Sequence, residues 1–336
     1  LWGGGVRELI LKHARENRWS WVTDHPAEFD RKFVAVGHPR MDLARYGIRK
    51  REGSDKVRIG FIGLCPAINH NRFAPIKALL DVQERVAPGE PKEEMYFEAK
   101  YFDLITRLIQ ELGTDHHTFS IRPYPLENVA NYRETNLVKS GRLAVDDSIE
   151  FTSWVKEQDL VIGAVSTTMY QIAASGKSYI NVDQLLDRPM GPRCFANEYL
   201  AAIPEHCPRT REEFLHMVRN WSDYRLTVKP GTILARQVAD HLSSGDNAPE
   251  LFQMARQIIG AARENPSPHG WPTGLAFRMN DLHCRYAVFR GEGRKPGNYS
   301  HFDRETILPK AAAEFGPVIE EVLAAVTAEQ RGQLHG

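Results

Sequence analysis

The stretch DLVIGAVSTTMYQIAASGKSYINVD, residues Asp159–Asp183, decides the fold of this chain. It opens with the apolar run Leu160–Ile162, which has the length and composition of a strand buried on both faces of a parallel sheet. A mostly apolar segment around Tyr170–Ala174 is predicted to be a helix, and Gly176 stands at the usual position of a C-cap glycine. A second apolar run, Tyr179–Val182, follows. This order of strand, helix and strand predicts a βαβ unit.

A hydroxyl triplet, Ser166, Thr167 and Thr168, stands where that helix begins. The first turn of a helix has free backbone N–H groups, which can bind an anion. Hydroxyl residues are also common N-caps, so the triplet is either a cap alone or part of an anion site. The residues at the neighbouring strand ends favour the site.

Three more apolar runs outside this unit have the character of strands. They are Val57–Leu64, His117–Ile121 and Leu143–Val145, and helical patterns separate them, including a long one over Glu93–Leu112. Strands that alternate with helices predict an α/β fold with a doubly wound parallel sheet. We expect the runs 57–64, 117–121, 160–164 and 179–182 to be neighbouring strands of that sheet.

Polar side chains follow several of these predicted strands. In doubly wound sheets, ligands bind beyond the carboxyl ends of the strands. We therefore expect the loops with Asn69, Arg122 and Ser166 to converge on one cleft. The loops concerned carry Asn69–Arg72, Arg122–Pro125, Asp146–Asp147 and Ser166–Thr168.

Arg122 is the clearest anion-binding candidate, because its planar guanidinium can clamp a phosphate and the neighbouring Pro123 and Pro125 stiffen the loop. The alternative is a structural arginine on a loop. Candidates for acid–base chemistry are His70 in the loop after the first strand, and Glu98 and Asp103 on the long helix. Carboxylates on such a helix commonly mark its solvent face.

Composition excludes several classes of protein. The 336 residues carry 43 basic and 43 acidic side chains, so no overall charge recruits nucleic acid. No apolar run approaches the roughly 20 residues of a membrane helix. Four scattered cysteines form no C-x-x-C pair, and a reducing cytoplasm is the expected setting. There is no G-x-G-x-x-G, P-loop, G-x-S-x-G or H-E-x-x-H motif.

The flanks differ from the centre. Helices are predicted over 6–15, 73–86, 149–155, 212–221, 233–242, 251–263 and 309–327, short strands over 19–22 and 33–36, and an irregular arm over 265–302. Residue 1 is Leu and no signal peptide is present, so we expect further sequence before it.

The succession of GHPRMD (37–42), RPYP (122–125) and SWVKEQDLVIGAVSTTMYQIAASGKSYINVD (153–183) resembles bacterial surface-polysaccharide biosynthesis proteins of the GT-B glycosyltransferase type. Similar elements occur in Kdo transferases, in sialyltransferase-like enzymes with CMP-sugar donors and in glycerophosphotransferases of wall-polymer synthesis. The resemblance covers about residues 33–185.

Such proteins carry an Arg/His-Pro element after one strand, and a Ser-Ser/Thr element that contacts the donor's phosphate. The resemblance therefore assigns donor or phosphate binding to Arg122, Tyr124 and Pro125, and to Ser166, Thr167 and Thr168. Where the family has His before Pro, this chain has Tyr124, which donates a hydrogen bond but carries no charge at neutral pH.

The resemblance implies a GT-B-like α/β protein with a helical C-terminal extension. Its parts are residues 1–45, the end of an N-terminal, acceptor-side Rossmann-like domain; 46–55, a linker; 56–215, the nucleotide-sugar-binding Rossmann-like domain; and 216–336, the extension. It further implies transfer of a sugar from a nucleotide-activated donor, such as a CMP-sugar, to a surface glycan of the capsule or lipopolysaccharide type. No cofactor and no metal are implied. The expected partners are the nucleotide-sugar, the glycan acceptor and, at the periphery of the inner membrane, the glycan assembly machinery.

Two alternatives share these features. A nucleotide-sugar epimerase of the same architecture would use the same phosphate-binding groups without an acceptor. A non-catalytic glycan-binding or assembly protein would bind without turnover, with Tyr124 as the sign of lost catalysis.

Overall fold

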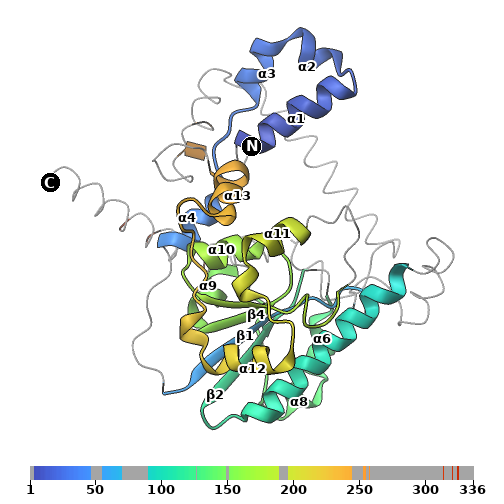
Figure 1. Ribbon diagram of the computed structural model, residues 1–336, viewed down its shortest axis with the longest axis vertical. Coiled ribbons are helices and arrows are strands. Elements are labelled where there is room, and N and C mark those ends of the chain that lie inside the picture. Colours follow the sequence, from blue (N-terminus) through green and yellow to red (C-terminus); the bar gives the residue numbers. More distant parts are fainter. Residues whose placement is uncertain are drawn as a thin grey trace, which may run out of the picture. The chain divides into compact units, whose positions relative to one another are not determined.

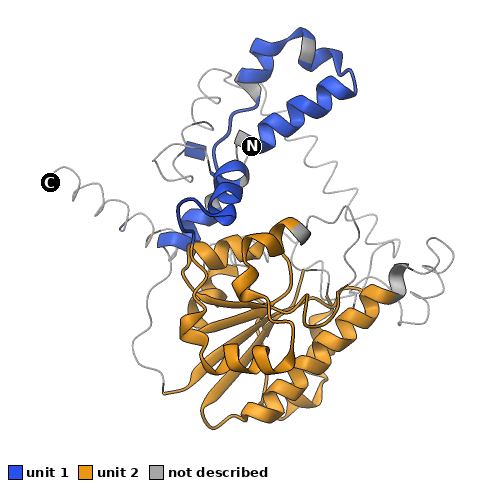
Figure 2. Cartoon of the chain, viewed as in Figure 1, with its two compact units in different colours: residues 1–47, 228–290, 321–336 blue, residues 48–227, 291–320 orange. Residues whose placement is uncertain are grey.

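The computed structural model describes residues 4–46, 55–69, 90–125, 127–148, 151–188, 196–243 and the isolated positions 253, 254, 257, 313, 320 and 324. By its internal contacts the chain divides into two compact units, shown in different colours in Figure 2. One comprises residues 48–227 with 291–320, and the other residues 1–47 with 228–290 and 321–336. The former is unit 2 in Figure 2, and the latter is unit 1.

Unit 2, the sheet unit, is built on a five-stranded parallel sheet (Figure 1). Its strands are β1 (Val57–Ile62), β2 (His117–Arg122), β3 (Ala144–Val145), β4 (Leu160–Gly163) and β5 (Ser178–Asn181), in the order β3-β2-β1-β4-β5. Every neighbouring pair is parallel. The α/β class and the predicted neighbourhood of the four longer strands are confirmed.

Helices lie between these strands and after the last of them. They are α6 (Glu90–Leu112), α7 (Val129–Arg133), α8 (Asn136–Lys139), α9 (Phe151–Glu157), α10 (Thr168–Ala174), α11 (Ala196–Ala202) and α12 (Arg211–Arg219), with the 3-10 turns η1 (Pro204–His206) and η2 (Trp221–Asp223). Gly113 and Gly176 follow α6 and α10 with φ of +67° and +61°, the left-handed C-cap conformation that the sequence predicts.

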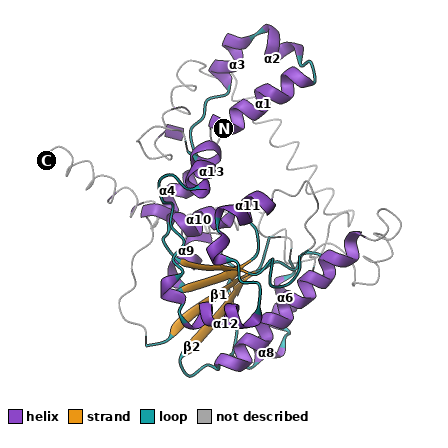
Figure 3. Ribbon diagram, viewed as in Figure 1, coloured by secondary structure: helices purple, strands orange, loops and turns teal. Residues whose placement is uncertain are grey.

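Successive side chains of each strand point to opposite faces of the sheet, and helices cover both faces (Figure 3). Ile59 and Phe61 of β1 point into a core formed with α6 and α12. Between them Gly60 faces the opposite way, and a Cβ there would come within 2.7 Å of Trp154 and Gln158 of α9 and its C-terminus. The buried Tyr101 of α6 ties the sheet together at its carboxyl edge, because its hydroxyl reaches the carbonyl oxygens of both Ile62 and Ile162, at 2.8 and 3.2 Å.

The described part of unit 1 is helical: α1 (Gly4–Glu16), α2 (Ser20–Asp24), α3 (Pro26–Lys32), α4 (Pro39–Tyr46) and α13 (Ile233–Leu242). The predicted strands at 19–22 and 33–36 are wrong. Residues 20–24 form α2, and Phe33–Val36 have no regular structure. Helix packing buries part of these segments instead: Val22 joins a small core with Ala14 and Phe29, and the half-buried Phe33 stacks on Phe29 with ring centroids 4.5 Å apart. Trp19 and Trp21 stay 48% and 38% exposed.

The predicted helices at 212–221 and 233–242 are confirmed as α12 and α13. The predicted helix 73–86, nearly all of 251–263 and 309–327, and the arm 265–302 lie outside the described residues. The division into an acceptor-side domain, a linker, a donor domain and an extension stays a prediction, although the two compact units meet in sequence at residues 47 and 48, inside the predicted linker. Among the helices described, none has both the length and the apolar character to cross a bilayer.

Candidate functional site

The strand order determines where a ligand can enter the sheet unit. Chain connections run from β1 outward to β2 and β3, and in the other direction to β4 and β5, so the topology switches between β1 and β4. In open α/β sheets the ligand crevice lies at such a switch point, beyond the carboxyl ends of the strands. The loops there begin at Gly63 and Ala164, directly after β1 and β4.

A buried carboxylate of α6 fixes the loop after β1. Glu98 is only 1% exposed, and its two carboxylate oxygens accept hydrogen bonds from the backbone N–H groups of Ala67 and Ile68, at 3.0 and 2.8 Å. Burial raises the pKa of Glu98 to about 7, although the two N–H donors oppose that rise. The structure therefore places this predicted catalytic residue in contact with the backbone of a loop.

A second buried carboxylate joins the loops after β1 and β2. Glu127 is 1% exposed and accepts hydrogen bonds from the N–H of Cys65, from the N–H of Tyr124 at 3.0 Å and from the hydroxyl of Tyr132 at 2.9 Å. The two loops touch so closely that a Cβ on Gly63 would lie 2.5 Å from a Glu127 oxygen and 2.6 Å from the nitrogen of Tyr124. Only glycine fits at this position.

Burial dominates the electrostatics of this cluster. It raises the pKa of Glu127 to about 7, against the effect of the three donors. Burial also raises the pKa of the Cys65 thiol and of the Tyr132 phenol, and both rise further beside the carboxylates. Both groups are therefore neutral at physiological pH. The Tyr132 phenol donates to Glu127 and stabilises its ionised form, whereas the Cys65 thiol donates to the carbonyl oxygen of Glu98 at 3.7 Å.

A third buried carboxylate, Asp183, lies two residues after the end of β5 and fixes the loop after β4. Its Oδ2 accepts the N–H of Val165 at 2.5 Å, and its Oδ1 lies 3.1 Å from the guanidinium of Arg188. Burial raises the pKa of Asp183, and Arg188 opposes that rise. Arg188 also pairs with Glu94 at 2.7 Å and lies over the ring of Phe97. This arrangement links the loop after β4 to α6.

The hydroxyl triplet lies at the switch point, as its place after β4 requires. The hydroxyl of Ser166 accepts a long hydrogen bond, 3.4 Å, from the N–H of Thr168, which is the first residue of α10. Thr167 is exposed and makes no side-chain capping bond. The hydroxyl of Thr168 is buried without a hydrogen-bond partner. The triplet thus caps α10 only weakly, and a ligand could reach the half-buried Ser166 and the exposed Thr167 but not the buried hydroxyl of Thr168.

Arg122 ends β2 on the same edge of the sheet, but its guanidinium already has partners. It forms an ion pair with Asp146 and donates to the hydroxyl and carbonyl oxygens of Ser148 at 2.6 and 2.7 Å. Its side chain is 12% exposed. Tyr124, two residues on, is 46% exposed, and Pro125 is exposed as well. The loop therefore presents a tyrosine ring to solvent and an arginine that is largely covered.

The other predicted site residues are spread more widely. Asn69 contacts the loop after β2 through Asn128 and Asn131. Asp103 is exposed on α6, where it pairs with Arg107 at 2.7 Å. His70 lies outside the described residues. The structure thus brings Asn69, the Arg122 loop and the Ser166 loop to one edge, and places Asp103 on the solvent side of its helix.

Glu127 and its partner Tyr132 were not predicted as site residues. The available signal was a carboxylate soon after RPYP, in a segment with few other charges, but the sequence does not show that this group is buried. The role of Asp183 was also missed, although its position directly after an apolar strand is an indication.

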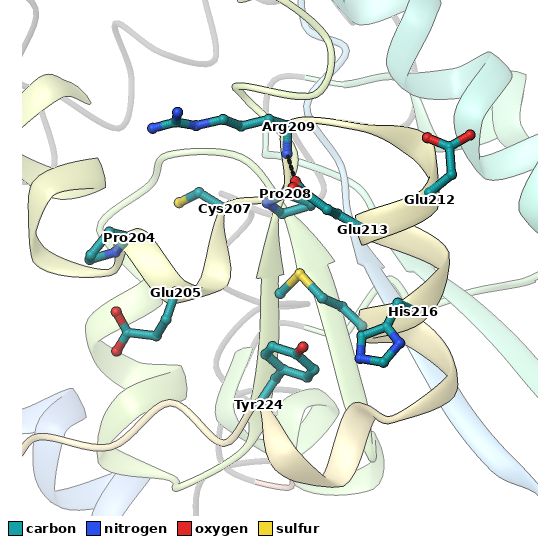
Figure 4. A pocket seen from close by; sticks show the side chains of 10 residues that line it. Pro204, Glu205, Cys207, Pro208, Arg209, Glu212, Glu213, His216 and Tyr224 are labelled. Carbon is teal, nitrogen blue, oxygen red and sulfur yellow. Dashed lines mark hydrogen bonds between the residues drawn. The ribbon is translucent and has the colours of Figure 1, made fainter.

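A separate hollow of about 620 Å³ lies between η1, α12 and η2 (Figure 4). Met217 and Tyr224 line it together with His216, and the N–H of Arg209 donates to Glu213 at 2.7 Å at its rim. Burial raises the pKa of Cys207, which also lines it, to about 12. None of the predicted site residues belongs to this hollow. Among the described residues no group of three or more His, Cys, Asp or Glu side chains could hold a metal ion.

Comparison with known proteins adds the following. No protein-family model matches the chain, and no curated protein matches it. Three matching solved structures are of variants of the wall teichoic acid polymerase TagF, one of them soaked with CDPG. Their identities to this chain are 14%, 15% and 15%, with TM-scores of 0.41, 0.42 and 0.40. The matches cover 70%, 70% and 68% of this chain but 52%, 53% and 48% of the polymerase chains, so the chain spans about half their length.

Proposed function

We propose that this chain binds a nucleotide-activated sugar donor and belongs to a metal-independent glycosyltransferase of the GT-B type that acts on a bacterial surface glycan. The observation that carries the proposal is that the Ser166–Thr168 loop and the β1 loop follow neighbouring parallel strands, at the switch point of a sheet with the order β3-β2-β1-β4-β5. Nucleotides bind doubly wound sheets at this place.

The proposed chemistry is stabilisation of the leaving nucleotide phosphate. The hydroxyls of Ser166 and Thr167 and the N–H groups beside them would donate to it, and Arg122, on the neighbouring strand end, would supply a positive charge. Preorganised donors of this kind stabilise charge that develops in a transition state, and here they would do so without a metal. Cytoplasmic placement at the periphery of the inner membrane, where surface glycans are assembled, is part of the proposal.

We choose between the candidates for the acceptor-side catalytic base by the solvent exposure of their side chains. Asp103 is open to solvent, and His70 follows the β1 loop directly in sequence. Glu98 is buried and both of its oxygens accept backbone N–H groups. We therefore assign Glu98 to the support of the loop, and assign base catalysis to His70 or Asp103.

Calorimetric titration with UDP and CMP tests the donor site, with Arg122→Ala as the principal variant. A charge-assisted hydrogen bond contributes roughly 1.5–3 kcal/mol, so Arg122→Ala should weaken nucleotide binding about tenfold to a hundredfold. Asp146→Asn is the matched control, because it weakens the same ion pair and keeps the cation. It should leave affinity unchanged or raise it. Equal losses in both variants, with unchanged thermal melts, would show that Arg122 acts only through its ion pair.

Incubation with a nucleotide-sugar then separates the reactions. A transferase needs a glycan acceptor to convert the donor, whereas an epimerase converts the nucleotide-sugar alone. A glycan-binding protein would leave the donor unchanged under both conditions.

A further inference from the structure

The backbone of Tyr124 is fixed on both sides by one residue. Its N–H donates to Oε2 of Glu127 at 3.0 Å, and its carbonyl oxygen accepts the N–H of Glu127 at 2.8 Å. Pro123 and Pro125 flank it and restrict the backbone further. The ring, by contrast, is 46% exposed. A side chain whose backbone is already held in place is preorganised, so a ligand that binds it orders less of the loop.

The same carboxylate also determines where this turn lies relative to the switch point. Its second oxygen accepts the N–H of Cys65, in the loop after β1. The absence of a side chain at Gly63 lets the two loops touch. Glu127 therefore sets the distance between the Tyr124 turn and the loop that opens the proposed donor crevice.

We propose that Glu127 is a positioning residue of the donor site, which acts through Tyr124 by holding the Tyr124 turn against the loop after β1, so that the phenol hydroxyl donates to a phosphate oxygen of the donor. This inference rests on the proposed function. Because the turn is ordered before the ligand arrives, binding costs little further loss of conformational entropy.

Glu98 is the control that distinguishes a residue that positions Tyr124 from a buried carboxylate that only stabilises the loops. It is as deeply buried as Glu127 and also accepts two backbone N–H groups of the β1 loop. Its described hydrogen bonds do not include the Tyr124 turn. A purely structural carboxylate at this edge should behave like Glu98.

A double-mutant cycle tests the inference. UDP and CMP are titrated into the wild type, Glu127→Gln, Tyr124→Ala and the double variant, and the same cycle is built with Glu98→Gln. Loss of one hydrogen bond to a charged oxygen should weaken binding roughly tenfold in each single variant of the first cycle. If Glu127 acts through Tyr124, the double variant should lose about tenfold as well, and not a hundredfold. In the Glu98 cycle, the effect of Tyr124→Ala should be the same with and without Glu98→Gln.

If the losses of affinity in Glu127→Gln and Tyr124→Ala multiply in the double variant, the inference is wrong, but the proposed donor site is not affected. If the wild type bound neither nucleotide, the proposed function itself would fail, and the inference with it. Should Glu127→Gln not fold, Tyr132→Phe replaces it, because it removes only the hydroxyl that donates to Glu127. Tyr101→Phe is then the control, as that hydroxyl donates to the carbonyl oxygens of Ile62 and Ile162.

The pH dependence of nucleotide binding gives a second test, because a carboxylate that only stabilises the loops would not change it. The titratable groups that face Glu127 are Cys65 from the β1 loop, Tyr132 from α7, and Glu98 and Tyr101 from α6. Below its pKa, wild-type Glu127 is neutral, as glutamine is. The ratio of dissociation constants, Glu127→Gln over wild type, should therefore fall from roughly ten at pH 8.5 toward one at pH 6. A ratio that is constant over this range would contradict positioning by the ionised carboxylate.

Discussion

Titration of Glu127 should make its own contribution to the pH dependence of the sheet unit's stability. Glu127→Gln should remove that contribution alone, because Glu98, whose pKa burial also raises to about 7, still titrates. Burial raises the pKa of the Glu127 carboxyl to about 7, from an ordinary 4.5. Between these two values the folded state keeps a proton that the unfolded state has released, so stability falls as pH rises through this window. At about 1.4 kcal/mol per pKa unit, the total fall due to Glu127 is roughly 3 kcal/mol. Near pH 6 the slope is about 1.2 kcal/mol per pH unit.

Glu127→Gln cannot titrate, so its stability curve should be flatter than the wild-type curve by this slope between pH 5 and 7, and parallel to it above pH 8. Hydrogen exchange at the amides of β1 and β4 measures the free energy of opening the sheet unit itself. The difference between the two proteins at each pH cancels the intrinsic exchange rates. The offset between the curves depends on how well the glutamine amide fits, whereas the difference in slope does not. Parallel curves from pH 5 to 8 would refute a buried carboxyl with a raised pKa at this position.

Two further substitutions test the packing at the carboxyl edge by chemical denaturation. Gly63→Ala should cost about 1–3 kcal/mol, because its Cβ would meet backbone atoms of the Tyr124 turn. Gly113→Ala, a glycine with φ of +67° and open space around it, should cost only about 1 kcal/mol, and an equal loss in both would argue against the close contact. Arg188→Ala should cost about 3 kcal/mol or more, since it leaves the buried carboxylate of Asp183 without its cation. Arg107→Ala, which breaks an exposed pair, should cost under about 1 kcal/mol, and a loss as small in Arg188→Ala would show that Asp183 needs no partner.

The sheet could be predicted from the sequence because its signals are local. Val57–Ile62 and Leu160–Gly163 are short apolar runs bounded by glycine or a loop, and such runs have few ways to be buried other than as central strands. Gly176 showed the end of α10 for the same reason. Val22 and Phe33 carried similar apolar signals but lie in helix and loop, since a strand forms only where another strand pairs with it, and their own unit offers helices to pack on.

The candidate site could be predicted only as far as its strand ends. The sequence places Arg122 and Ser166 on one edge of the sheet, because the carboxyl ends of parallel strands share that edge. The partners of those residues depend on long-range contacts that no local pattern carries. Asp146 lies 24 residues from the arginine it neutralises, and Glu127 lies 62 residues from the Cys65 N–H that it accepts. The same separation explains the pKa values of the carboxylates, since burial causes them and burial is a property of the assembled fold. The RPYP motif therefore predicts where Arg122 lies in the fold, but it does not predict the partners of the arginine. Its freedom to bind an anion is decided by Asp146, and for that reason the matched pair of Arg122→Ala and Asp146→Asn is the decisive measurement of the donor site.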